Sequence, residues 1–422
     1  MGRRRMEPGM RIELDDYDHE RDFRAVDRIY SEVGWIDGSD DATKKHEHLA
    51  AAVYEGIVFR LDGEAECAAL TSLGAMKHLD TDVELAVVTG VTTSRVARKL
   101  GAAKRATAAA IARRAEAGSE LSALGMFEQG FYDRLGFGSG AYSNWMTFDP
   151  ATLTVERRFR PPKRLTKDNW RDVHHALCER LRGHGGCVLH QPEIIRGELA
   201  FSEKPVGLGY YDGPGGTLSH FFWGEAEGEN GPYNIFWYAY RTPEQLFELL
   251  ALIRSLGDQV VSVRMAEPPE IQFQDVLAQP FRNRRVTRGS KLTSDHRTMA
   301  WWQARMLDVP KCLAKTRLDT DDFTFNLQLS DPIEEHLEDG NAWRGVAGDY
   351  VVTLGRQSSA RHGTVASLPT LCASVGAFTR VWLGVRSASV LARTDDLRGD
   401  ADLLCGLDHA LDLPQPYVGW DY

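Results

Sequence analysis

The sequence predicts an α+β protein of more than one domain, with mixed β-sheets that carry helices on both faces. Three observations support this fold class. Consecutive strand patterns precede an alanine-rich helix, a second strand–helix–strand order follows later, and the chain has 422 residues. This length is enough for two or three domains that each have a core of their own.

The first ninety residues predict two helices and four strands. Residues 20–34 place apolar side chains at helical spacing and end at Gly34, which is typical of an amphipathic helix. An acidic loop that holds Trp35 and Asp37 follows, and then a helix over His46–Tyr54. The strands that follow a first one at Arg11–Leu14 are predicted at Gly56–Leu61, Ala65–Ala75 and Val83–Val91.

Residues 85–138 form the central stretch of the chain. A β-branched strand runs into the turn Thr92–Gly101, and alanine then dominates up to Ala117, which predicts a helix. The start of that helix combines unpaired N–H groups with the cations Arg98, Lys99 and Lys104. Since the helix dipole and free amides attract anions, this turn is a candidate pyrophosphate site, although basic helix starts are more often solvated faces.

A strand at Leu121–Phe127 and an aromatic segment, Gly130–Gly138, complete the stretch. The order strand, R-x-x-G turn, helix, strand and F-Y-x-x-L-G-F resembles the acyl-coenzyme A core of the GNAT N-acetyltransferases. The V91-x-T93-x-R95-x-x-R98-x-x-G101 spacing and the Gly130–Gly138 segment resemble the enhanced intracellular survival (Eis) acetyltransferases in particular. Arg95 departs from that pattern, because the family usually has proline there, and we expect a less rigid start of the loop.

The middle of the chain repeats the strand–helix–strand order. After Pro161-Pro162 come a helix near Lys167–Arg182 and a run of strands over Val188–Tyr240. Thr242, Pro243 and Gln245 then predict a capped helix start, followed by a strand at Gln259–Met265. The glycine and cations of the earlier turn are missing, so we expect a second GNAT-like fold that does not hold coenzyme A.

The last part of the chain begins with R-x-x-D-V-P-x-x-L over Arg305–Leu313, which is similar to the opening of the sterol-carrier-protein-like domain of the same family. Alternating strands, a helix that starts at Ser367 and a final helix at Asp402–Leu411 are predicted. The tail from Asp412 to Tyr422 is marked by proline and strongly aromatic. A free tail of this kind would expose large aromatic side chains, so we expect it to insert into the fold.

The resemblance implies three domains. These are a catalytic GNAT domain that binds acetyl-CoA (residues 1–150), a degenerate second GNAT-like domain (151–294) and a sterol-carrier-like α/β domain (295–422) whose C-terminal tail enters the active site. Assembly as a homo-oligomer, hexameric in much of the family, is implied as well.

The resemblance also implies the site residues. Tyr132 matches the general acid that protonates the departing thiolate, and the α-carboxylate of Tyr422 matches the general base. A substrate ammonium would meet Trp35, Asp37 and Asp421. The acetyl-CoA contacts would come from Val91, Thr92, Thr93, Arg98, Lys99, Leu100, Gly101, Ala102, Ala103, Lys104, Phe127 and Glu128.

Composition narrows the partners. A net charge of −10 argues against nucleic acid and suits a cationic substrate. The sequence has no long apolar run, so we expect no membrane association and a cytoplasmic protein. The six scattered cysteines and the isolated histidines indicate neither a disulfide framework nor a metal site.

These observations predict an N-acetyltransferase that moves an acetyl group from acetyl-CoA to an aminoglycoside, a polyamine or a lysine side chain. Two alternatives stay open. One is a narrow biosynthetic or protein-lysine acetyltransferase of the same architecture. The other is a non-catalytic protein that binds acyl-CoA or an apolar ligand.

Overall fold

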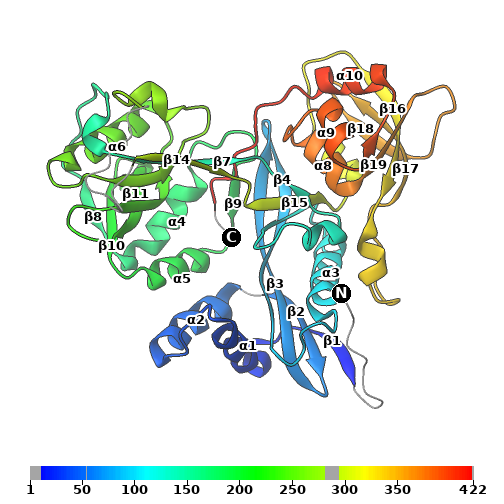
Figure 1. Cartoon of the computed structure of the whole chain (residues 1–422), viewed down its shortest axis with the longest axis horizontal. Helices are drawn as coiled ribbons and strands as arrows, with labels where there is room; N and C mark the ends of the chain where they lie inside the picture. Colours follow the sequence, from blue (N-terminus) through cyan, green and yellow to red (C-terminus); the bar gives the residue numbers. More distant parts are fainter. Residues whose placement is uncertain (1–10, 54, 281–293, 421–422) are drawn as a thin grey trace. The chain divides into compact units, whose positions relative to one another are not determined.

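The chain folds into two compact units. The structure is a computed structural model that describes residues 11–53, 55–280 and 294–420. The first unit combines Met1–Ala141, His184–Gln191 and Trp301–Tyr422, and the second combines Tyr142–Gly183 with Pro192–Ala300. Figure 1 traces both along the chain. The three predicted domain ranges stay a prediction.

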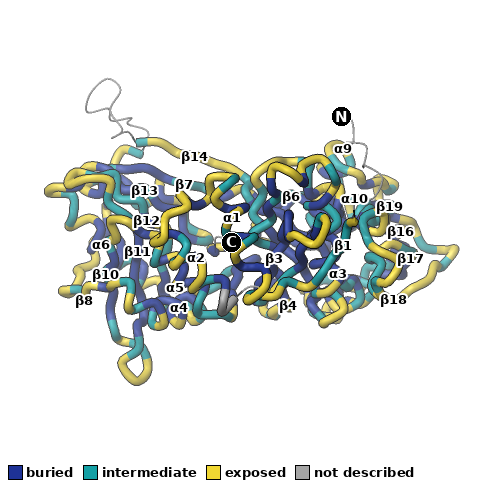
Figure 2. Tube along the Cα trace, turned by 90° about the horizontal axis from the view of Figure 1, so that it is seen from below, coloured by how far each residue is buried: buried dark blue, intermediate teal, exposed yellow. Residues whose placement is uncertain are grey.

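An eight-stranded mixed sheet organises the first unit, in the order β1-β2-β3-β4-β5-β15-β6, with β9 paired to β3. Its long central strand β3 is buried along most of its length, as Figure 2 shows. Asp62 and Gly63, both with positive φ, form the turn that joins β2 to β3. The strands are β1 (Ile12–Asp16), β2 (Glu55–Leu61), β3 (Glu64–His78), β4 (Thr81–Thr93), β5 (Leu121–Gly125), β6 (Gly138–Ser139), β9 (Cys187–Leu189) and β15 (Trp302–Met306).

Helices cover both faces of this sheet. Helix α1 (His19–Val33) begins at the N-cap Asp18, ends at the left-handed Gly34 and packs Val26 and Tyr30 on Val58 of β2. The alanine-rich helix α3 (Ala102–Glu116) packs on the neighbouring residue Ile57, which points to the opposite face because side chains alternate along a strand. Helix α2 (Asp40–Val53) follows α1. The predicted mixed sheet with helices on both faces is thus present here.

Strand β15 completes the sheet from far along the chain. It pairs antiparallel with both β5 and β6, so residues 302–306 fill the place beside the strand that ends at Gly125. Conversely, β7 (Ser143–Phe148) belongs to the sheet of the second unit, where it pairs with β13 and β14. Strands therefore cross the sequence boundaries near residues 150 and 295.

A five-stranded sheet, in the order β18-β17-β16-β19-β20, lies in the C-terminal part of the first unit. We predicted a helix from Ser367; that prediction is wrong, because residues 370–374 form a strand parallel to β16 and the helix begins only at Val375, capped by Ser374. The elements are α7 (Val309–Ala314), β16 (Phe323–Ser330), β17 (Gly348–Leu354), β18 (Ser359–His362), β19 (Thr370–Ser374), α8 (Val375–Trp382), α9 (Ala388–Thr394), β20 (Leu397–Arg398) and α10 (Ala401–Ala410).

The second unit is a seven-stranded sheet, in the order β14-β7-β13-β12-β11-β10-β8, with a core in which α6 (Pro243–Ser255) packs on the strands. The run of strands predicted over Val188–Tyr240 is interrupted by helix α5 (Glu193–Phe201), whose nine residues lack a side-chain cap. The other elements are α4 (Trp170–Cys178), β8 (Lys163–Leu165), β10 (Pro205–Tyr210), β11 (His220–Ala226), β12 (Tyr233–Ala239), β13 (Val263–Ala266) and β14 (Asp295–Met299).

Candidate active site

The candidate site lies in the first unit, where β4 and β5 part. These strands run parallel and stay paired only from Leu85–Leu121 to Val88–Leu124. Beyond that point the chain after β5 turns away, since the amide of Met126 donates to the carbonyl of Trp301 at 2.7 Å. Strand β4 continues on β3 up to Thr93. Among the described strands, none pairs with the β5 side of residues 89–93, so an extended ligand can add there as a strand.

Gly90 makes the bulge in β4 at this point. The register to β3 shifts between Ala68 and Leu70, and Gly90 has φ 58°. A β-carbon on Gly90 would lie 2.4 Å from the hydroxyl oxygen of Tyr30, so only glycine lets α1 approach the strand this closely. Tyr30 had not been predicted as part of the site, because nothing in the local sequence places it against Gly90.

The turn after β4 ends in an open helix start. Lys99 and Gly101 have φ values of 69° and 83°, and Gly101 is the N-cap of α3 without a side-chain capping hydrogen bond. Its carbonyl accepts the amide of Arg105 at 3.1 Å, and helix geometry leaves the amides of Ala102 and Ala103 without a partner inside the helix. Among the described residues, space around Gly101 is open, because an added β-carbon would meet none of their atoms within 4 Å.

Cations surround this helix start. Arg98 and Lys99 are exposed and Lys104 is half-buried. Leu100 is half-buried and packs against the hydrophobic cluster that joins α3 to β2. Arg105 forms an ion pair with Glu338 at 2.8 Å and lies over the ring of Phe59. Amides and cations at one helix end favour an anion, and the pyrophosphate site at this turn stays a prediction.

Arg95 ties the start of this turn to α1. Its amide donates to the carboxylate of Glu32 at 3.1 Å, and its guanidinium donates to the Glu32 carbonyl at 3.1 Å. Proline cannot donate the first of these bonds. The loss of rigidity expected from arginine at this position is therefore offset by a tether that sequence reasoning missed.

Tyr132 lies on the β5 side of the opening. It begins a 3₁₀ turn, Tyr132–Leu135, that ends at the left-handed Gly136, and it is 3% exposed. Its ring belongs to the same cluster as Val88 and Val91 of β4. Burial, and to a smaller extent the neighbouring Cys67, raises the pKa of the Tyr132 phenol. The group is therefore protonated at neutral pH.

Aromatic and polar residues flank the opening. Phe127 is 71% exposed, with its ring centroid 5.9 Å from that of Tyr132, and Glu128 is exposed. On the α1 side, Trp35 is 53% exposed and packs edge-on against Tyr30 at 4.8 Å. Asp37 is exposed and accepts the amide of Ser39 at 2.8 Å, and hydrogen bonds from Ser39 lower the pKa of its carboxyl.

The tail is anchored up to its last described residue. The amide of Tyr417 donates to the carbonyl of His184, and the amide of Cys187 donates to the carbonyl of Val418, both at 2.9 Å. Trp420 is buried. The predicted insertion of the tail therefore holds for residues up to 420. Asp421 and Tyr422, which are predicted to supply the two carboxylates of the site, lie outside the described residues.

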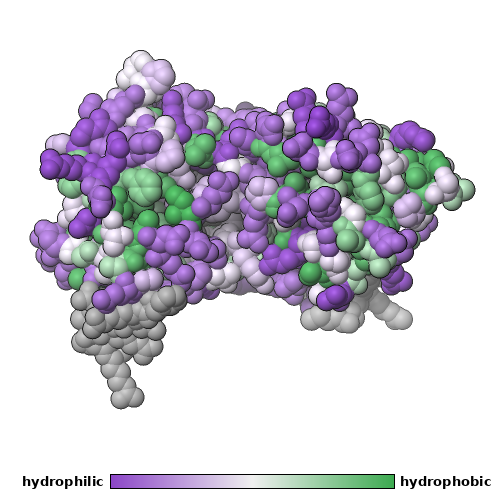
Figure 3. All heavy atoms as spheres, turned by 90° about the horizontal axis from the view of Figure 1, so that it is seen from above, coloured by the Kyte–Doolittle hydropathy of each residue, from purple (hydrophilic) through white to green (hydrophobic). Residues whose placement is uncertain are grey.

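Within the described ranges, we find neither a metal-binding group nor a membrane-spanning helix. Within them, no group of three or more histidine, cysteine, aspartate or glutamate side chains is arranged to hold a metal ion. None of the helices described combines the length and apolar character needed to cross a bilayer. On the face seen in Figure 3, apolar side chains are interspersed among hydrophilic ones.

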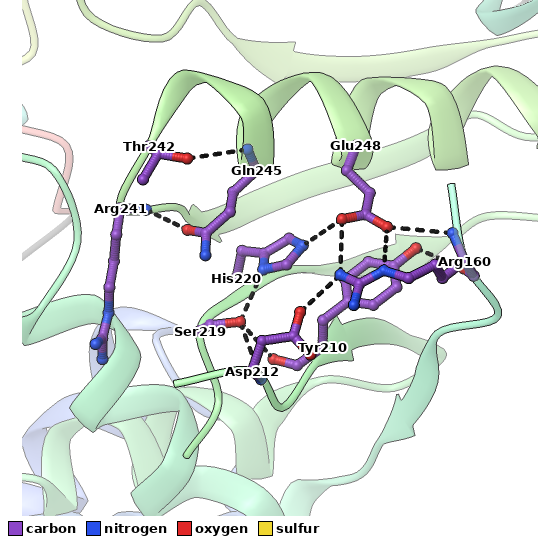
Figure 4. Close-up of polar contacts among 9 residues, drawn as sticks. All are labelled: Arg160, Tyr210, Asp212, Ser219, His220, Arg241, Thr242, Gln245 and Glu248. Carbon is purple, nitrogen blue, oxygen red and sulfur yellow. Dashed lines mark hydrogen bonds and ion pairs between the residues drawn. The ribbon is translucent and has the colours of Figure 1, made fainter. Parts of the chain in front are cut away.

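The second unit closes the equivalent helix start. β12 and β13 are also parallel, and α6 follows β12. Thr242, however, caps this helix by accepting the amide of Gln245, and the Gln245 side chain accepts the amide of Arg241, so side-chain oxygens occupy the helix end (Figure 4).

The same helix carries a charged network. Glu248 of α6 is paired with Arg160, which also reaches Asp212 at 2.6 Å (Figure 4). His220 bridges Glu248 and Ser219, at 3.3 Å and 2.8 Å. Ser219 and His220 are buried, so the Ser219 hydroxyl is not exposed to a substrate.

Comparison with solved structures adds the fold. The chain is similar to a probable N-acyltransferase of unknown function from Enterococcus faecalis, with a TM-score of 0.78 and 17% identity over 98% of this chain and 100% of that one. A GCN5-related N-acetyltransferase from Anabaena variabilis gives 0.76 and 13% over 98% and 100%. Eis1 from Mycobacterium abscessus gives 0.75 and 14% over 97% and 100%. The sequence matches no family model, and no curated protein matches it.

At these identities the likeness establishes the fold alone. The chain has the fold of the GCN5-related N-acetyltransferases, and the predicted resemblance to GNAT and Eis proteins is confirmed at that level. The sterol-carrier assignment of the C-terminal part stays a prediction.

Proposed function

We propose that this chain is an Eis-like N-acetyltransferase that transfers an acetyl group from acetyl-CoA to the amine of a cationic substrate. One observation carries the proposal. In a GNAT fold, the end of β4, which has no described strand on its β5 side, leads through the turn at 94–101 to an open, cationic helix start, and Tyr132 packs against that same strand.

The residues present fit acetyl-CoA. Backbone groups of Val91, Thr92 and Thr93 lie on the strand edge that can pair with the pantetheine arm. Amides at the start of α3 and the side chains of Arg98 and Lys99 would hold the pyrophosphate. Phe127 and Glu128, exposed after β5, would border the opposite side.

Tyr132 is assigned the role of general acid. As the amine nitrogen bonds to the thioester carbonyl carbon, the carbon–sulfur bond breaks, and the sulfur takes the phenol proton. A thiol has a reference pKa of about 8.5, below that of a phenol at about 10, so the sulfur accepts the phenol proton only once the carbon–sulfur bond is largely broken and the thiolate charge has developed. Its protonated state at neutral pH supports this role.

The terminal carboxylate of Tyr422 is assigned the role of general base. An α-carboxyl has a reference pKa of about 3.5 and is ionised at neutral pH, so it attracts an ammonium and accepts its proton. Support comes from the anchored residues 417–420, which fix the tail just before its end. Asp421, Asp37 and Trp35 would contact the substrate.

The substrate class is proposed from charge. A chain of net charge −10 attracts polyamines, aminoglycosides and lysine side chains more readily than anions. We also propose a homo-oligomer, on the basis of the resemblance alone.

The test is thiol release from acetyl-CoA by protein with its native C-terminus, with spermidine, kanamycin and a lysine-containing peptide as acceptors. Turnover with any of them supports the proposal. Tight acetyl-CoA binding without turnover redirects the search to other amines. Absence of both turnover and binding overturns the proposal and favours the non-catalytic alternative.

A further inference from the structure

Strand β15 touches the 3₁₀ turn that begins with Tyr132. Gln303 and Arg305 are two residues apart on this strand and thus point to the same side, and both are fully buried. Gln303 donates to the carboxylate of Asp133 at 2.7 Å. Arg305 donates to the carbonyl of Leu135. The turn is therefore held at two points, one and three residues after Tyr132.

Arg305 is itself fixed by Asp331. The two side chains form a bidentate ion pair, with distances of 3.2 and 2.5 Å, and both are 0% exposed. Asp331 also accepts the amides of Ile333 and Val346, at 3.2 and 2.9 Å. A buried carboxylate with this many donors has one position, and so does the guanidinium paired with it.

Glycine makes room for this arrangement. A β-carbon on Gly136 would lie 2.8 Å from the Arg305 guanidinium, and one on Gly345 would lie 2.7 Å from Asp331. The ring of Trp343 lies 5.3 Å from the guanidinium carbon. The ion pair is therefore enclosed by packing on several sides. Because Arg305 is fixed in this way, its hydrogen bond fixes the position of the Leu135 carbonyl.

We infer that Gln303 and Arg305, with Asp331 as counter-ion, are positioning residues that set where the Tyr132 hydroxyl meets the substrate. This inference rests on the proposed role of Tyr132 as general acid. It also gives the strand beside β5 a role in catalysis, although it lies about 170 residues after Tyr132 in the sequence.

Two kinds of variant test the inference. Asp133 is exposed, and Asp133→Ala removes its hydrogen bond to Gln303. Asp133→Asn is the matched control, because it is equally uncharged but keeps an oxygen that can accept this bond. Arg305→Lys keeps a cation beside Asp331 but loses the planar fork that also reaches Leu135. Each variant is made alone and with Tyr132→Phe.

We expect Asp133→Ala and Arg305→Lys to lower kcat on the order of tenfold, with little change in the KM for acetyl-CoA. Asp133→Asn should restore most of the loss. In the Tyr132→Phe background neither variant should lower kcat further, because the hydroxyl that they position is gone. Losses that add in full to Tyr132→Phe would overturn the inference and leave the proposed function standing.

Hydrogen exchange provides a readout without turnover. The amides of Gly136 and Phe137 donate to the carbonyls of Asp133 and Tyr132 within the turn. They should exchange faster in both variants, at an unchanged melting temperature in Asp133→Ala and at a lower one in Arg305→Lys, which weakens a buried ion pair. Unchanged exchange in Asp133→Ala would overturn the positioning role. An unchanged kcat in Tyr132→Phe would instead remove the proposed acid.

Discussion

At Gly101, the backbone conformation determines the shape of the proposed pyrophosphate site. Its φ of 83° is strained for an L side chain, and it caps α3 without a side-chain bond. Gly101→Val should strain the backbone of the turn by about 1–2 kcal/mol and so displace it from the helix start. If that free energy is lost from cofactor binding, the KM for acetyl-CoA should rise roughly tenfold.

Gly101→Asn is the matched control for this prediction, because asparagine tolerates the left-handed region. Its KM should stay close to that of the wild type. The measurement is acetyl-CoA titration at saturating amine. An equal KM for the valine and asparagine variants would remove the turn from the cofactor site.

The element scale is where prediction from sequence succeeds and fails most clearly. Helix α3 and strand β4 were predicted within a few residues because alanine content and β-branched runs are local signals. Helix α5 was missed because its nine residues carry no cap and lie among strand-like segments. The place of β15 beside β5 depends on long-range pairing, which no local pattern encodes.

The same distinction applies to the site. The turn around Gly101 was predicted from its own residues, and the role of Tyr132 was predicted from the family resemblance. Contacts between distant segments, such as Glu32 with Arg95 and Tyr30 with Gly90, became visible only in the fold.

Helix α6 supplies a prediction on stability. Glu248 is 4% exposed, and its pairing with Arg160 lowers the pKa of its carboxyl to about 2. Arg160→Met would leave the buried carboxylate with His220 as its remaining partner, so we expect a loss of about 2 kcal/mol in the free energy of unfolding at pH 7. Arg157→Met, at an exposed position on the same segment, is the control and should have little effect.

The pH dependence of that loss has a definite sign. Because the folded pKa of Glu248 is depressed, its contribution is present above the unfolded pKa of about 4.5 and disappears as pH falls toward 2. Denaturant unfolding of both variants at pH 7 and pH 3 measures it. A difference between Arg160→Met and wild type that persists undiminished at pH 3 would contradict the assignment.

At the scale of the whole first unit, two buried histidines join segments that are distant in sequence. His78 of β3 stacks on Trp382 at 4.2 Å and bonds to its carbonyl, and His184 bonds to the carbonyl of Leu383. Burial, and then the neighbouring His184, lowers the pKa of His78 to about 3, and burial lowers the pKa of His184 as well. Both histidines are therefore neutral in the fold.

These depressed pKa values predict acid sensitivity. Below pH 6.5 the unfolded chain binds protons that the folded chain does not, so the stability present above pH 6.5 falls as pH decreases toward 3. His78→Phe keeps a ring on Trp382 and should make this decline shallower, while the exposed His48→Gln should leave its slope unchanged. Unfolding midpoints between pH 7 and 4 measure the slopes, and equal slopes for His78→Phe and wild type would refute the role of His78.

The C-terminal tail links the fold of the first unit to the proposed chemistry. Tyr417 hydrogen-bonds to His184, Val418 hydrogen-bonds to Cys187 at the start of β9, and Trp420 is buried, so a residue added after Tyr422 should leave these anchors in place. The added residue converts the α-carboxylate into an amide and moves the new carboxylate onward.

If the carboxylate of Tyr422 accepts the ammonium proton, one added glycine should lower kcat on the order of a hundredfold at an unchanged melting temperature. Asp421→Asn keeps the terminal carboxylate and should mainly raise the KM for the amine. Full turnover in the extended protein would mean that a group other than the Tyr422 carboxylate acts as the base. A lower melting temperature would show that the end of the tail contributes mainly to stability.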